Sequence, residues 1–175
     1  MASMDDAAGK TERLLAHAQS LVDSGDPENA ALFLRRAVEH DPSAPKIYDL
    51  LGEVEMSLGN EEEACRAWMR AIESSGDPNE PCNAERWMYL AQTQEGDASR
   101  QSYLQGIALL SARLGIQPAH ADKSSEGNAE DTTKGKLCVA YCALAELYLT
   151  DLCFEDTAEQ ACQVQWDSVR KIGRA

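Results

Sequence analysis

Apolar residues along this chain recur in a pattern that repeats every 34 residues. The repeated positions alternate large and small side chains, pairing Leu14 with Tyr48, Ala18 with Gly52, Ala30 with Ala64, Leu34 with Trp68 and Ala37 with Ala71. A repeat of this length is long enough for two short antiparallel helices. The alternation of sizes indicates that a bulky side chain of one helix wedges against small ones on its neighbour.

This period is typical of tetratricopeptide-like repeats, so the sequence predicts an all-α superhelix of about four helical hairpins. The eight expected helices cover residues 11–23, 27–40, 45–58, 61–74, a stretch around 85–91, 97–114, 135–150 and 156–171. Residues 1–10 are expected to be a flexible N-terminus, and residues 11–175 to form one helical repeat domain. Within it, residues 117–134 lack apolar periodicity and are predicted to be a flexible insertion.

Local signals set the helix ends in the first two hairpins. Asp26 followed by Pro27 predicts a capped start for the second helix. Asn60 before three glutamates predicts a capping box at the start of the fourth. Glu55 stands where a large apolar residue is usual, so we expect the third helix to sit slightly differently.

Composition adds a strong acidic bias to this helical picture. Hydrophobic residues make up 43% of the chain and aromatic residues only 6%, and 16 Lys and Arg against 30 Asp and Glu give a net charge of -14. Such a charge repels nucleic acid and anionic membranes and attracts basic partners. The alternative is that the acidity only keeps the protein soluble.

The sequence offers weak signals for catalysis or metal binding, and we expect no enzyme activity, no cofactor and no metal. Gly9, Lys10 and Thr11 imitate the end of a phosphate-binding loop, but Met4 stands where its first glycine belongs. Cys138 and Cys142 lie one helical turn apart without a nearby His, so they are interpreted as core residues. With no recognisable signal peptide or membrane span, the expected location is the cytoplasm and nucleus.

The first helix of each hairpin lines the concave surface of such an array, and carboxylates dominate its outward positions. Repeat register places eight carboxylates and one lysine, Lys46, on this surface. The eight candidate partner-binding residues are Glu12, Asp23, Asp49, Glu53, Glu85, Glu95, Glu146 and Asp151. They predict a groove that accepts Lys- and Arg-rich segments, although outward charges on amphipathic helices can also be merely solvated.

The end of the chain carries apolar residues at helical spacing with no later helix to cover them. Trp166, Val169 and Ile172 fall in this last predicted helix. We therefore expect a monomer with weak self-association through the C-terminal helix.

One stretch resembles a known family more closely than general repeat positions do. Residues 146–155, followed by Ala158 and Glu159, resemble the signature of the dedicated assembly chaperones of large-subunit ribosomal protein four. Residues 89–92 and Leu137-Cys138 are similar to the same family. The run from Thr150 to Cys153 is the most specific part, because repeat packing is not expected to dictate it. Asp156 departs from the family pattern, in which Pro is expected.

The resemblance implies a chaperone that captures a basic loop of the newly made ribosomal protein and supports ribosome assembly. The charge of the predicted groove points to the same kind of client. A generic adaptor or scaffold in a multiprotein complex is the alternative, because an acidic groove suits a basic peptide in both cases.

Overall fold

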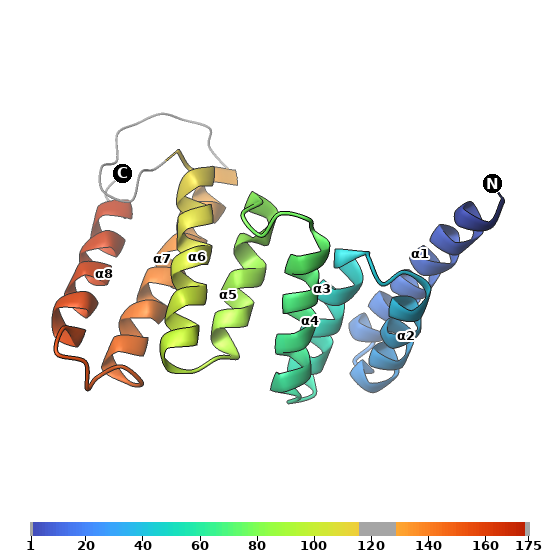
Figure 1. The fold of residues 1–175 in the computed structure, drawn as a ribbon, viewed down its shortest axis with the longest axis horizontal. Coiled ribbons are helices and arrows are strands. Elements are labelled where there is room, and N and C mark those ends of the chain that lie inside the picture. The colour runs from blue at the N-terminus through green and yellow to red at the C-terminus, as the bar shows by residue number, and fades with distance from the viewer. Residues whose placement is uncertain (1, 116–128, 174–175) are drawn as a thin grey trace. The chain divides into compact units, whose positions relative to one another are not determined.

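A computed structural model describes residues 2–115 and 129–173 of the protein (Figure 1). All regular elements in these ranges are helices, which confirms the predicted all-α, tetratricopeptide-like fold. They are α1 (Ala2–Asp23), α2 (Pro27–His40), α3 (Pro45–Ser57), α4 (Glu61–Ser74), a 3-10 turn (Pro81–Asn83), α5 (Ala84–Gln92), α6 (Gly96–Arg113), α7 (Ala129–Leu149) and α8 (Ala158–Ile172). The chain divides into two compact units, residues 1–78 and 79–175.

The first unit consists of two hairpins, α1 with α2 and α3 with α4. Helices α2 and α4 have the predicted bounds, because local signals define them. Asp26 caps α2 as predicted, accepting a hydrogen bond from the backbone N–H of Asn29 at 3.2 Å. Helix α1 begins at Ala2, so residues 2–10, which we assigned to a flexible N-terminus, belong to this helix.

The 34-residue period corresponds to direct contact between large and small side chains. Trp68 of α4 is buried against Gly52 of α3, and a Cβ atom added to Gly52 would lie 2.6 Å from Cε2 of the indole. The two helices approach so closely at this point that only a residue without a side chain fits. The predicted wedge between large and small residues is therefore realised in the second hairpin.

Glu55 has an unexpected role in the first unit. Its side chain is almost completely buried, with 1% of the residue exposed, and its Oε1 lies 2.7 Å from Nη2 of Arg35 in α2. Its other oxygen accepts a hydrogen bond from Nδ2 of Asn60 at 2.8 Å. This carboxylate thus connects α3 to the preceding hairpin and to the start of α4.

The capping box predicted at Asn60 is wrong. Asn60 occupies the N-cap position of α4, but its side chain does not cap that helix. The amide group donates to Oε2 of Glu55 instead, because this second oxygen of a buried carboxylate needs a partner more than an N–H group at a solvent-exposed helix end does.

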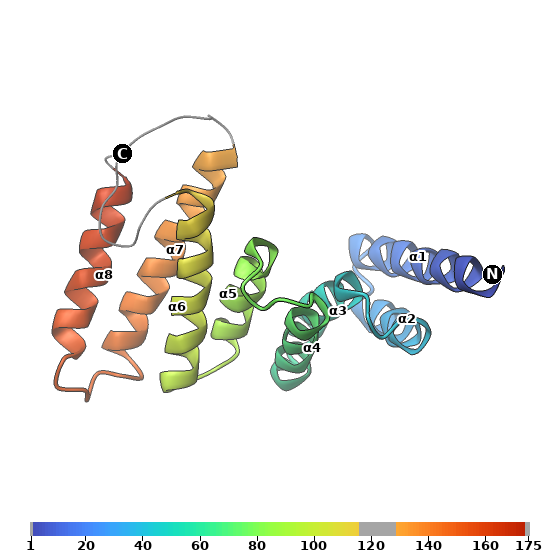
Figure 2. The ribbon, with the colours of Figure 1, turned by 45° about the horizontal axis from the view of Figure 1, so that its top comes forward.

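The second unit contains α5 to α8, packed as two hairpins around one apolar core (Figure 2). Helices α6 and α7 also pack against each other, so the two hairpins share that core. Gly106 of α6 faces Met88 of α5, repeating the large and small contact of the first unit. Residues 116–128 of the predicted insertion lie outside the described residues. Residues 129–134 were assigned to the insertion as well, but they form the first turns of α7, and Thr133 is buried.

Part of the apolar surface of α8 is buried against the core of the second unit. Val169 and Ile172, expected to be uncovered, pack against the core of the second unit, while Trp166 stays exposed as expected. Two of the three apolar residues expected to be exposed are therefore partly covered, while Val164 of the same helix is exposed. Weak self-association through α8 stays a prediction.

The Trp68 contact predicts opposite effects for two glycine substitutions. Gly52→Ala should lower the free energy of unfolding by about 1–2 kcal/mol, because overpacking against the indole outweighs the gain in helix propensity. Gly135→Ala in α7 meets no atom within 4 Å and should raise it by up to about 1 kcal/mol. Urea denaturation of the variants measures both effects. Equal shifts would show that the Gly52 contact is loose.

The buried carboxylate predicts non-additive mutations. Arg35→Met should destabilise the protein by about 1–2 kcal/mol, because the buried carboxylate of Glu55 loses its cationic partner. The loss is no larger because Arg35 is exposed, so water already screens this ion pair. The double variant Arg35→Met, Glu55→Leu should recover most of this loss. A double-mutant cycle measured by denaturation tests the coupling, and strictly additive effects would contradict it.

Candidate functional site

Four of the eight predicted partner-binding carboxylates lie in the first unit, on first helices as expected. Glu12, Asp23 and Glu53 are exposed, and Asp49 is half-buried. Asp23 accepts a hydrogen bond from the side-chain amide of Gln19 one turn earlier in α1. Asp49 and Glu53 are one helical turn apart on α3, so their charges act together on anything that contacts this face.

Two further carboxylates lie on the first helices of the second unit. Glu85 of α5 is half-buried and forms an ion pair with Lys136 of α7. Glu146 of α7 is exposed, and it lies near Tyr103 of α6. Burial, with a smaller contribution from the charge of Glu146, raises the pKa of the Tyr103 phenol. Glu146 therefore presents a carboxylate to solvent, whereas the charge of Glu85 is balanced.

The last two carboxylates are not on first helices, and the sequence placed them wrongly. Glu95 follows α5 and occupies the N-cap position of α6 without a side-chain cap bond. Asp151 follows α7, and its Oδ2 accepts a hydrogen bond from the backbone N–H of Gly96 at 3.2 Å. Asp151 thus supplies, from the next hairpin, a negative charge at the N-terminus of α6.

The turn that carries the specific signature, residues 150–155, is attached to α6 at a second point. Glu155 forms two hydrogen bonds with Nη1 of Arg100, at 2.9 and 2.8 Å, and Arg100 also pairs with Asp97. Leu152, which lies between Asp151 and Glu155 in the sequence, is buried, while Phe154 is 95% exposed. Asp151, within the run from Thr150 to Cys153, and Glu155, two residues after it, both connect the turn after α7 to α6.

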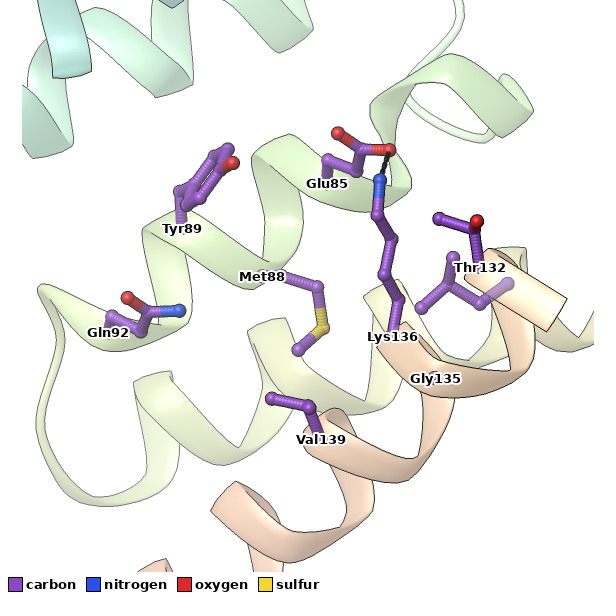
Figure 3. A pocket seen from close by; sticks show the side chains of 9 residues that line it. Glu85, Met88, Tyr89, Gln92, Thr132, Gly135, Lys136 and Val139 are labelled. Atoms are coloured by element: carbon purple, nitrogen blue, oxygen red, sulfur yellow. Dashed lines mark hydrogen bonds and ion pairs between the residues drawn. The ribbon is translucent and has the colours of Figure 1, made fainter. Parts of the chain in front are cut away.

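A cleft of about 340 Å³ opens between α5 and α7 in the second unit (Figure 3). Met88 points from α5 toward Val139 of α7, and Tyr89 and Gln92 line the α5 side. The ion pair of Glu85 with Lys136 lies at one end of the cleft. Of the eight predicted partner-binding carboxylates, Glu85 lines this space.

Sequence reasoning missed two residues of this cleft. Lys136 was not counted among the outward positions, so the groove was predicted to be more acidic than this part of it is. Its place one helical turn before Val139 was the available signal. Tyr89 was noted only as part of the family resemblance, although it contributes an aromatic wall.

The cysteines show no reactive or metal-binding arrangement in the part of the chain that the structure describes. Burial, and to a smaller extent the neighbouring Cys142, raises the pKa of the Cys138 thiol. A thiol with a raised pKa is a poor nucleophile and a poor metal ligand. Among the described residues, no three His, Cys, Asp or Glu side chains gather into a possible metal site. No described helix is long and apolar enough to cross a membrane.

Comparison with curated proteins finds a relative in sequence. The chain is 27% identical over 141 residues to a protein of Schizosaccharomyces pombe described as a probable assembly chaperone of rpl4. This match covers 79% of the chain and 39% of that protein, so the chain spans well under half of its length. No family model matches the sequence.

Solved structures point to a protein with the same kind of description and to the general fold. The structure of Assembly Chaperone of RpL4 (Acl4), residues 1–338, matches 93% of this chain and 62% of its own length, with a TM-score of 0.74 and 27% identity. MamA matches 94% of this chain and 81% of its own, with a TM-score of 0.67 and 18% identity, and this likeness shows the fold alone. Over most of its length, this chain is therefore similar to the assembly chaperones of RpL4, as residues 146–159 predicted.

Proposed function

We propose that this protein is a chaperone for ribosomal protein L4 and supports assembly of the large ribosomal subunit. The observation that carries the proposal is the match to Acl4 in both sequence and fold. The chain has a helical hairpin fold that suits protein binding, and the relatives that resemble it in sequence are described as assembly chaperones. The proposed activity is binding, without catalysis or a cofactor.

The proposed ligand is a Lys- and Arg-rich segment of the client. A net charge of -14 favours encounter with a basic protein and opposes direct contact with RNA. Exposed carboxylates on α1, α3 and α7 support this choice, with Glu12, Asp23, Glu53 and Glu146 as the outward members. Such binding would shield the basic segment from RNA in the cytoplasm and carry it to the nucleus.

The carboxylates identified from the sequence do not contribute equally in this proposal. Glu85 is paired with Lys136, and Asp151 is engaged at the start of α6. Asp49 and Glu53 stand one helical turn apart on α3, so one double variant reverses two charges on the same face, and for this reason they are the first choice for charge reversal. Glu146 is the first choice in the second unit, since it is exposed on α7.

Reversing both carboxylates of α3 should weaken client binding by at least tenfold. The variant Asp49→Lys, Glu53→Lys places two cations opposite a basic ligand, and like charges repel across an interface. Calorimetry with a synthetic peptide of the basic L4 segment measures the affinity, and circular dichroism checks the fold. The control Glu39→Lys, Glu73→Lys changes net charge equally on the second helices α2 and α4. Equal affinities of the two variants would contradict a role for α3.

Salt should weaken the same interaction in the wild-type protein. The Debye length falls from about 10 Å at 0.1 M salt to about 3 Å at 1 M, so exposed charges attract one another less. We expect affinity for the L4 peptide to fall steadily over this range, with the association rate accounting for much of the loss. Affinity that does not change with salt would argue against recognition of a basic segment.

A further inference from the structure

The α5–α7 cleft differs in chemistry from the acidic surface that the sequence predicts. Its walls are Met88 and Tyr89 on α5 and Val139 on α7, and Leu110 of α6 lines its interior. At one end, Glu85 and Lys136 balance each other, so the cleft has no excess charge to attract a cation there. A volume of about 340 Å³ is suited to one large apolar side chain.

Helix α7 presents more than the cleft wall on its exposed face. Val139 is 65% exposed and Leu149 is 60% exposed, and Glu146 lies between them on the same face. Val139 is continuous with the apolar walls of the cleft, and a contiguous exposed apolar surface with polar residues at its edge is typical of a binding site. The exposed face of α7 therefore offers an apolar contact at Val139 and a negative charge at Glu146, further along the helix.

The helix sets the distance between these two features. Val139 and Glu146 are seven residues apart, which corresponds to about 10 Å along an α-helix. An extended peptide advances about 3.3 Å per residue, so about three of its residues cover that distance. A bound segment that places an apolar side chain in the cleft can place a cation near Glu146 about three residues away.

Resting on the proposed function, we propose that the α5–α7 cleft binds a large apolar side chain within the basic client segment. Glu146 then pairs with a Lys or Arg about three residues from that side chain. The apolar contact gives the protein a means to select one basic segment among many, because charge alone attracts them all. In this proposal, Val139 and Met88 contact the apolar side chain of the client.

A charge introduced into the cleft distinguishes this proposal from attraction by charge alone. Val139→Glu adds a carboxylate, so purely electrostatic binding of a basic peptide would become tighter. An apolar site would bind at least tenfold more weakly, because the new charge would lose water on binding. Val164→Glu on α8 is the matched control, since Val164 is 59% exposed and lies outside the cleft. Both wild-type residues are exposed, so both variants should fold.

The probes are the basic L4 peptide, the same peptide with each large apolar residue changed in turn to Ser, and an oligolysine of equal charge. Calorimetry should show that Val139→Glu weakens L4 peptide binding and Val164→Glu does not. The methyl resonance of Met88 should shift with the L4 peptide and stay unchanged when the cleft-binding residue is Ser.

The alternative outcomes distinguish failure of the cleft proposal from failure of the proposed function. Binding by Val139→Glu as tight as that of Val164→Glu, with a salt-sensitive wild type, would overturn the cleft proposal and leave the proposed function standing. Equal affinity of the wild-type protein for oligolysine and the L4 peptide would overturn it in the same way. Failure of the folded wild-type protein to bind the L4 peptide at all would overturn the proposed function and the cleft proposal with it.

Discussion

Close contact between helices at small residues is the constraint on which this structure depends. A hairpin of two short helices has little apolar surface, so it becomes stable only when bulky side chains reach deep into a neighbouring helix. Trp68 over Gly52 and Met88 near Gly106 are the places where this happens. Within each unit, the same packing leaves the outward positions of the first helices available for charged residues.

The sequence predicted those features that depend on neighbours along the chain. The bounds of α2 and α4 follow from Pro, Asp and Gly residues within a few positions of each helix end. The helical class followed from the 34-residue period, since periodicity is a local property repeated many times. The polar start of α7 was misread because residues 129–134 lack apolar spacing, yet Thr133 packs inside.

Contacts between residues that are far apart along the chain could not be predicted from the sequence. Glu55 was recognised as unusual, but its partner Arg35 is 20 residues earlier and belongs to another hairpin. Asp151 was predicted to bind a partner. Its hydrogen bond with the N–H of Gly96 was not predicted, because the two residues are 55 positions apart. The balance between Glu85 and Lys136 likewise joins two helices separated by 51 residues. For Asp151 and Glu85, these contacts occupy charges that sequence register alone counted as outward.

The attachment of Asp151 and Glu155 to α6 has a consequence for how the protein forms during synthesis. Helix α6 leaves the ribosome with an uncapped N-terminus and an incompletely paired Arg100, because both partners lie 55 residues further along the chain. Domains generally fold from the N-terminus as they are made, and long-range contacts close last. The third hairpin therefore reaches its final stability only after the turn following α7 has emerged, so the two hairpins of the second unit mature as a pair.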